Sequence, residues 1–118
     1  MPIQKVNDKL FLIDENDELI TRCVYIINLK GTNFYKIGLS GNLTQRLKQI
    51  QSYNPLKIKL SVAEVFPYSV ANKIEKRLHE KYKTFCVHGE WFEFESISSQ
   101  DLRDSINVES NKLEISVE

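Results

Sequence analysis

Two short runs of apolar, β-branched and aromatic residues lie close together in the first half of the chain, at residues 22–29 and 34–39. The intervening Lys-Gly-Thr-Asn is typical of a hairpin loop, so the two runs predict paired antiparallel strands. A Gly/Ser turn follows, and apolar residues then recur at helical spacing after Asn42, which is a suitable N-cap with Gln45 as its box partner. The pattern predicts a strand-turn-strand-helix unit whose helix buries Leu43, Leu47 and Ile50.

The hairpin has one natural register. A four-residue loop at 30–33 places Tyr25 opposite Gly38 and Ile27 opposite Lys36. Tyr25 and Lys36 then share one face of the sheet as diagonal neighbours. Because Gly38 has no side chain, we expect room there for another group to approach the sheet.

Residues 56–66 alternate apolar with polar positions, which predicts a half-exposed third strand. Its apolar face is expected to consist of Ile58, Leu60 and Val62. Lys57 and Lys59 on the other face are candidates for nucleic-acid contact, although any surface strand shows the same alternation.

A second helix is predicted from about Ser69, as its N-cap, to Lys83. Glu75 and His79 are four residues apart and therefore point the same way along the edge of its apolar stripe. They form either a functional acid-imidazole pair or an ordinary helix pair. The exposed remainder of this helix carries further candidates for nucleic-acid contact, Lys73 and Arg77.

The two ends of the chain are acidic. Residues 10–13 and 19–21 are expected to form a hairpin around the turn at 14–17, within an N-terminal extension of residues 1–21. Residues 96–118 are expected to add a helix to about Asn107 and a tail that alternates like a strand, packed on the central domain of residues 22–95.

The net charge of zero conceals a strong asymmetry. Residues 22–83 contain twelve Lys and Arg against three Asp and Glu, a net charge of +9, whereas residues 1–21 carry −3 and residues 84–118 carry −6. A basic centre suits binding to a polyanion. Alternatively, the acidic ends fold over the basic segment and neutralise it.

The composition also narrows the class of protein. Two isolated cysteines do not provide the spacing of a disulfide framework or a zinc site. No apolar run approaches the roughly 20 residues that span a membrane, and the first ten residues lack the apolar centre of a signal peptide. We therefore expect a single soluble domain in the cytoplasm, or inside the host cell if the protein is viral.

Several short motifs resemble those of the GIY-YIG nuclease superfamily. Its two naming motifs correspond to Cys23-Val24-Tyr25 and Lys36-Ile37-Gly38, its helix arginine to Arg46 and its metal-binding glutamate to Glu75. The block at 89–92, Gly-Glu-Trp-Phe, resembles the end of the domain in a phage and viral branch. The resemblance covers about residues 22–95. Cys23 and Lys36 depart from it, since they stand where the family has glycine and tyrosine.

The resemblance implies a small α/β (α+β) fold, with a three-stranded, mainly antiparallel central sheet flanked by helices. It also implies a metal-dependent endonuclease or nickase that hydrolyses phosphodiester bonds in DNA, with one Mg²⁺ or Mn²⁺ on Glu75. Arg46 would hold the scissile phosphate and Tyr25 would position and deprotonate the attacking water. From its position beside Tyr25, and not from the resemblance, we also expect Lys36 to lower the pKa of Tyr25. His79 is expected to pass a proton or orient a phosphate.

Two other functions remain open from the sequence. The first is a nucleic-acid-binding module that has kept the fold and lost cleavage. The second is a viral protein-interaction factor whose acidic ends contact a protein partner.

Overall fold

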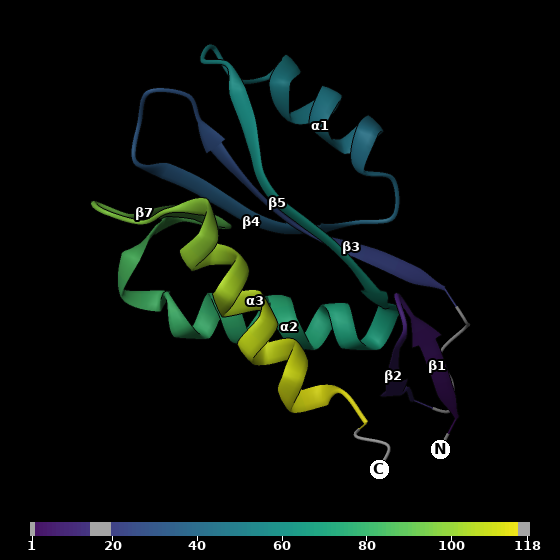
Figure 1. The fold of residues 1–118 in the computed structure, drawn as a ribbon. Helices are drawn as coiled ribbons and strands as arrows, with labels where there is room; N and C mark the ends of the chain where they lie inside the picture. The colour runs from purple at the N-terminus through teal and green to yellow at the C-terminus, as the bar shows by residue number, and fades with distance from the viewer. Residues whose placement is uncertain (1, 15–19, 116–118) are drawn as a thin grey trace.

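The computed structural model describes residues 2–14 and 20–115, and Figure 1 shows their arrangement. In chain order the elements are β1 (Ile3–Val6), β2 (Lys9–Leu12), β3 (Thr21–Leu29), β4 (Phe34–Ser40), α1 (Leu43–Ser52), β5 (Ile58–Pro67), α2 (Tyr68–Lys81), the 3₁₀ turn η1 (Lys83–Phe85), β6 (Cys86–His88), β7 (Trp91–Glu93) and α3 (Ser99–Leu113). The described helices include none that is both long enough and apolar enough to cross a membrane.

The fold is α+β, with a five-stranded antiparallel sheet in the order β5-β3-β4-β7-β6 and a separate two-stranded sheet of β1 and β2. The prediction of three strands is therefore wrong. The two additional strands, β6 and β7, have only three residues each. Trp91 and Glu93 alternate with Phe92 in the sequence, which suggests a short strand or an extended segment, but a run this short does not indicate which strand it pairs with. They form a hairpin that extends the sheet beyond β4.

The predicted central hairpin is confirmed. Tyr25 pairs with Gly38 and Ile27 pairs with Lys36. Asn42 caps α1 as predicted, because its side chain accepts a hydrogen bond from the Gln45 backbone N–H at 3.1 Å. The reciprocal bond of a capping box is replaced, since the Asn42 backbone N–H donates to Ser40 Oγ at 3.0 Å.

The predicted alternation along β5 is interrupted by a bulge. Ile26 pairs with Val62 while Ile27 pairs with Leu60, so Ser61 is an extra residue in β5. Because one extra residue reverses the faces, Val62 joins the core on the other side of the sheet and Leu60 is exposed. The expected single apolar face of Ile58, Leu60 and Val62 is therefore wrong.

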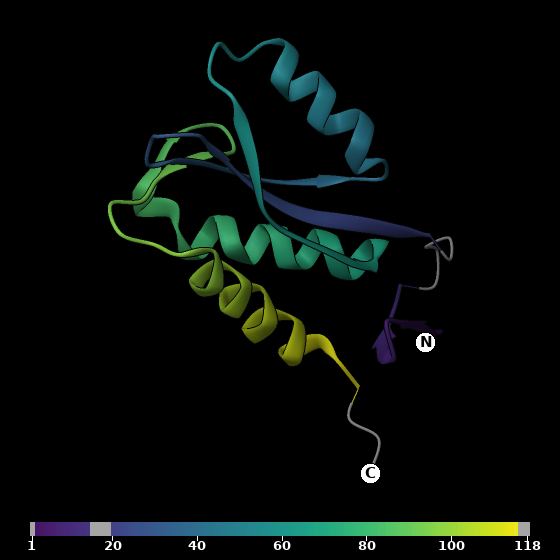
Figure 2. The same cartoon turned by 45° about the horizontal axis from the view of Figure 1, so that its top comes forward.

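The sheet separates two cores, with α2 and α3 below it and α1 above it in Figure 2. The larger core joins Val24, Ile26 and Ile37 of the sheet to α2 and α3 through Ile74, Leu78, Leu102 and Ile106. The smaller core contains Cys23, Tyr25, Ile27 and Ile50. Only Ile50 of α1 is fully buried, whereas five residues of α2 are buried.

The N-terminal hairpin differs from its prediction. It consists of β1 and β2 and turns at Asn7 and Asp8, whose φ angles of 52° and 64° suit these two residue types. The turn predicted at 14–17 falls largely on residues 15–19, outside the described residues, and Thr21 begins β3 instead. Phe11 packs edge-on against Phe66 of β5, with ring centroids 6.1 Å apart.

Two helix boundaries also differ. α2 has Pro67 at its N-cap position, and the predicted cap Ser69 is the second residue of the helix, where it is buried without a hydrogen bond from its hydroxyl. α3 begins after Ser98 with a capping box to Asp101 and continues to Leu113, beyond the predicted end at 107. Of the predicted terminal strand, the described residues form a single bridge, between Phe11 and Glu114, and residues 116–118 lie outside the described residues.

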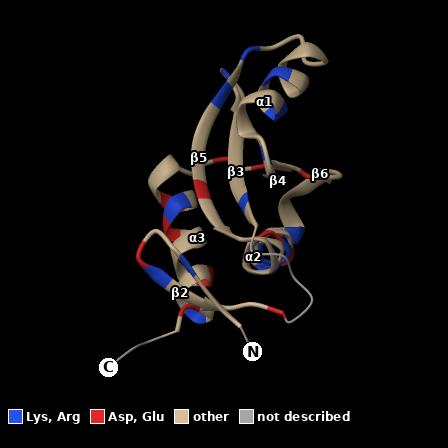
Figure 3. Cartoon of the chain, turned by 90° about the vertical axis from the view of Figure 1, so that its right-hand side faces the viewer, with Lys and Arg blue, Asp and Glu red and all other residues tan. Residues whose placement is uncertain are grey.

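Charge is divided unevenly along the chain. Residues 20–63, which form β3, β4, α1 and the first part of β5, contain seven Lys and Arg and no Asp or Glu. We call this segment the basic lobe, and Figure 3 shows its cations on α1 without acidic neighbours on that helix. Acidic residues from both ends of the chain form ion pairs with α2 instead. Lys73 Nζ lies 4.0 Å from Asp14 Oδ1, and Arg77 Nη1 lies 3.6 Å from Glu109 Oε2.

Candidate metal and phosphate site

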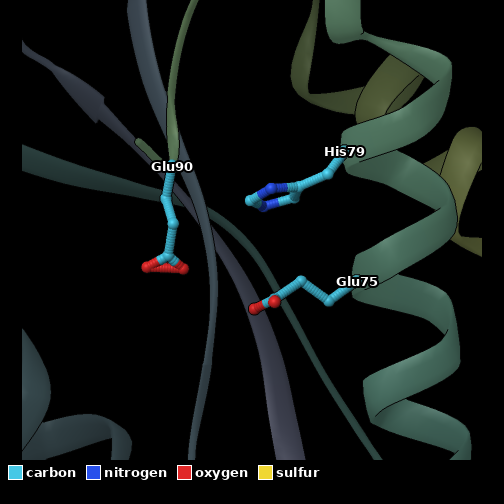
Figure 4. Close-up of side chains that lie close together, drawn as sticks. All are labelled: Glu75, His79 and Glu90. Carbon is cyan, nitrogen blue, oxygen red and sulfur yellow. The ribbon is translucent and has the colours of Figure 1, made fainter. Parts of the chain in front are cut away.

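Three potential metal ligands converge beside the edge of β4. Glu75 and His79 project from successive turns of α2, and Glu90 projects from the turn before β7 (Figure 4). One ligand atom from each lies within 4.8 Å of the others. The pairing of β7 with β4 ends at Lys36, so the turn that carries Glu90 lies beside Ile37. The structure thus brings together the predicted Glu75 and His79 and adds Glu90.

The His79 ring is held in place by the Ile37 carbonyl and by Phe92. Nε2 lies 2.9 Å from the Ile37 carbonyl oxygen, and the ring packs edge-on against Phe92 with centroids 5.0 Å apart. When Nε2 carries the proton and donates to this carbonyl, the lone pair on Nδ1 is left to bind a ligand.

Glu90 is the site residue that the sequence analysis missed. Its carboxylate accepts a hydrogen bond from Lys36 Nζ at 3.2 Å, and its carbonyl accepts from the Ile37 N–H at 3.1 Å. Its only sequence signal is its place in the Gly-Glu-Trp-Phe block. Nothing in the spacing indicates that this block lies beside α2, because the contact depends on the short β6-β7 hairpin.

The Glu75 carboxylate has no ion pair with any described residue, and a carboxylate in this position suits a divalent cation. Burial raises the pKa of Glu75, and the nearby Glu90 carboxylate raises it further, while His79 and Lys36 oppose the rise. Oxygen atoms bound to one Mg²⁺ lie at about 2.1 Å from it, so two ligands are at most about 4.2 Å apart. A spread of up to 4.8 Å exceeds this limit, so the three side chains fit an Mg²⁺ ion when they move slightly closer or when one of them binds through a water that the ion keeps.

Tyr25 and Lys36 do not form the predicted pair. Lys36 is buried, pairs with Glu90 and lies over the Trp91 ring, with Nζ 5.6 Å from its centroid. Burial raises the pKa of Tyr25, although the hydrogen bond from Arg46 lowers it in part. The expectation that Lys36 lowers the pKa of Tyr25 is therefore wrong, because Glu90 takes up the charge of the lysine.

Tyr25 instead anchors Arg46. The tyrosine is fully buried, and its hydroxyl accepts a hydrogen bond from Arg46 Nε at 3.3 Å. Arg46 Nη1 donates to Gln49 at 3.4 Å. The guanidinium is thus fixed on one side and can present its other N–H groups to an anion.

Gly38 makes room for this tyrosine and not for a ligand. A Cβ atom at this position would lie 2.5 Å from the Tyr25 hydroxyl oxygen and 2.6 Å from the ring carbon that bears it. The expected space for an approaching group is therefore filled by the protein itself.

Gly38→Ala should destabilise the protein by about 1 to 3 kcal/mol, because a buried ring cannot move away without disturbing its neighbours. The shift should also break the hydrogen bond between Tyr25 and Arg46. Urea unfolding measures the loss. Gly41→Ala is the matched control, since its Cβ would meet only the end of the flexible Arg22 side chain, and it should have little effect. Equal stability of the two variants would contradict the packing described for Tyr25.

The candidate nucleic-acid contacts occupy two separate regions. Lys57 and Lys59 are exposed just before and at the start of β5, the edge strand farthest from the β6-β7 hairpin. Lys73 and Arg77 lie on α2 against the acidic ends of the chain. The neutralisation that the sequence left open thus affects α2, while a contact of these four side chains with nucleic acid stays a prediction.

A protein-family model described as the T5orf172 domain matches residues 22–109. Among curated proteins, the putative KilA-N domain-containing protein 315L of Invertebrate iridescent virus 6 is 32% identical over 76 residues. The match covers 61% of this chain and 33% of the relative, so the chain spans about a third of the relative's length. No solved structure matches the chain.

The family match corrects the assignment to the GIY-YIG superfamily, because the matched model is the T5orf172 domain. The classification as an endonuclease rested on that assignment and is corrected with it, since the family match establishes no enzymatic activity. Motifs of three or four residues, two of them altered at a defining position, could not carry the assignment.

Proposed function

The chain belongs to the T5orf172 domain family, and from this premise we propose that it is a nucleic-acid-binding domain that contacts DNA through its basic lobe. A DNA-binding role is compatible with the family. The observation that carries the proposal is the charge of residues 20–63, which include seven Lys and Arg and no Asp or Glu. Because its curated relative is a viral protein, we include in the proposal a viral role inside a host cell.

The basic lobe offers phosphates several cations without internal partners. Arg46, Lys48, Lys57 and Lys59 form no ion pair with any described residue. Such side chains release counterions when they meet a phosphate backbone, which favours binding irrespective of sequence. Arg46 is the best-oriented of them, since its bond to Tyr25 fixes the plane of the guanidinium.

A divalent cation, Mg²⁺ or Mn²⁺, is the second part of the proposal. Glu75 and Glu90 would supply carboxylate oxygens and His79 an imidazole nitrogen, from the positions described above. When bound, the cation would supply positive charge to a phosphate oxygen. Lys36 would hold Glu90 in place through its 3.2 Å contact.

Glu75→Gln should remove most of the affinity for Mn²⁺, at least tenfold, because a neutral amide is a poor substitute for a carboxylate ligand. Calorimetric titration with Mn²⁺ measures this directly. In a DNA-binding assay, Mn²⁺ should strengthen binding by the parent protein and have little effect on the variant. In EDTA the variant should bind DNA at least as tightly as the parent, because a negative charge has been removed.

Glu80→Gln is the matched control, since Glu80 is exposed on the same helix and lies outside the cluster.

The pH dependence of thermal unfolding gives a second test of Glu75. The raised pKa of Glu75 means that its ionised form opposes folding above the unfolded-state value near 4.5. In EDTA, Glu75→Gln should therefore unfold at a higher temperature than the parent at neutral pH, with the difference vanishing as the pH falls below about 4.5. Unchanged Mn²⁺ affinity in the variant would rule out this metal site.

A further inference from the structure

One side of α1 carries a polar and aromatic stripe next to its buried face. Arg46, Gln49 and Tyr53 are separated by three and four residues, so they follow one another along the same side of the helix. Arg46 is joined to the sheet through Tyr25 and to Gln49 through Nη1. Tyr53 is the C-cap of the helix, at the opposite end of the stripe from Arg46.

Tyr53 is unusually exposed for an aromatic residue of this protein. Its side chain is 59% exposed, and no described residue is hydrogen-bonded to its hydroxyl. Trp91, by contrast, is only partly exposed, packs on the smaller core and lies under Lys36. The ring of Tyr53 is therefore the large planar surface that the basic lobe offers to a binding partner.

The part of the sequence around Tyr53 contains both cations and exposed apolar residues. Residues 43–59 contain four Lys and Arg and no Asp or Glu. Leu56, in the following loop, and Leu60, on β5, are also exposed. Cations beside an exposed aromatic ring are the combination by which proteins bind single strands, with phosphates on the cations and bases on the ring.

The spacing along α1 matches this kind of ligand. Seven residues separate Arg46 from Tyr53, which corresponds to about 10 Å along the helix axis. That distance is about three steps of a nucleic-acid strand at roughly 3.4 Å per stacked nucleotide. A strand with one phosphate on Arg46 can therefore reach Tyr53 with a base two or three nucleotides away.

We propose that Tyr53 stacks on an unpaired base of a strand whose phosphate is bound by Arg46, so that the basic lobe prefers single-stranded or locally unpaired nucleic acid to a continuous duplex. This inference rests on the proposed nucleic-acid-binding function and names its substrate class. The preference for single strands follows because the faces of bases inside a duplex are covered by neighbouring bases and cannot stack on a protein ring.

The test compares a labelled twelve-nucleotide oligo(dT) with a duplex of the same length, by fluorescence anisotropy at one salt concentration. Tyr53→Ala should weaken binding of the single strand by about ten- to a hundredfold and binding of the duplex by less than about threefold. Tyr53→Phe should bind like the parent, because it keeps the ring. Tyr53→Leu should behave like Tyr53→Ala, because apolar area alone does not replace a stacking surface.

Phe85→Ala is the matched control, since Phe85 is also an exposed aromatic residue, at 49%, but lies in η1 outside the basic lobe. It should change neither affinity. Unchanged binding of the single strand by Tyr53→Ala, or an equal loss for both ligands, would overturn the stacking proposal while leaving the proposed function intact. A parent protein that binds neither ligand would overturn both, and the parent measurement alone identifies that case.

Discussion

Phe92→Ala should lower the free energy of unfolding by about 3 to 5 kcal/mol, the range measured for large aromatic residues removed from well-packed cores. Phe92 is 1% exposed and lies in β7, the strand that completes the site. Its ring stacks on Phe94 with centroids 6.1 Å apart and supports the ring of His79. The cavity left by alanine would therefore loosen both the core and the metal cluster, and urea unfolding measures the first effect.

The contrast with a surface phenylalanine makes this prediction specific. Phe85→Ala, on the exposed side of the same aromatic group, should cost about 1 kcal/mol or less, because much of its ring already contacts water. If Phe92→Ala were no more damaging than Phe85→Ala, β7 could not be docked against α2 as described. Mn²⁺ affinity of Phe92→Ala under folding conditions should also fall, since His79 loses its packing partner.

Raising the salt concentration from 50 to 200 mM should weaken DNA binding by roughly fifty- to 150-fold. The range follows from about four phosphate contacts, one for each unpaired cation within residues 43–59, with logarithmic slopes of about −0.7 per contact for single strands and −0.9 for duplex DNA. The four cations are Arg46, Lys48, Lys57 and Lys59. Fluorescence anisotropy across a salt series measures the slope.

Removing two of these cations should reduce the slope by about half. Lys57→Gln with Lys59→Gln is the test variant, and the loss of affinity should be similar for all DNA sequences, as expected for backbone contacts. Arg103→Gln with Lys112→Gln removes the same charge from α3 and should leave the slope nearly unchanged. A parent affinity that does not respond to salt would refute binding through the basic lobe.

The central hairpin could be predicted in detail because the sequence constrains it locally. Two regular apolar runs joined by a four-residue loop allow one register, and Tyr25 opposite Gly38 follows from it. The cap at Asn42 is also local, since it depends on residues three positions apart. The proximity of Glu75 and His79 follows from helix geometry alone.

The remaining features depend on contacts between distant parts of the chain. Glu90 reaches α2 only because the three-residue strands β6 and β7 fold back on the sheet. The bulge at Ser61 reverses the faces of β5, although the sequence alternates regularly through it. Lys36 could be placed on the correct face, but its partner could not be identified, because the carboxylate of Glu90 lies 54 residues away.

The shallow attachment of α1 affects how the protein moves. Ile50 is its one fully buried residue, so α1 should separate from the sheet at a lower free energy than α2. Its backbone amides should then exchange with deuterium through local opening, without unfolding of the larger core. A nucleic-acid strand that contacts both α1 and β5 would hold these two elements together. In the absence of nucleic acid, the proposed binding surface would thus be the part of the sheet domain that opens most readily. Bound nucleic acid would slow the hydrogen exchange of the α1 amides.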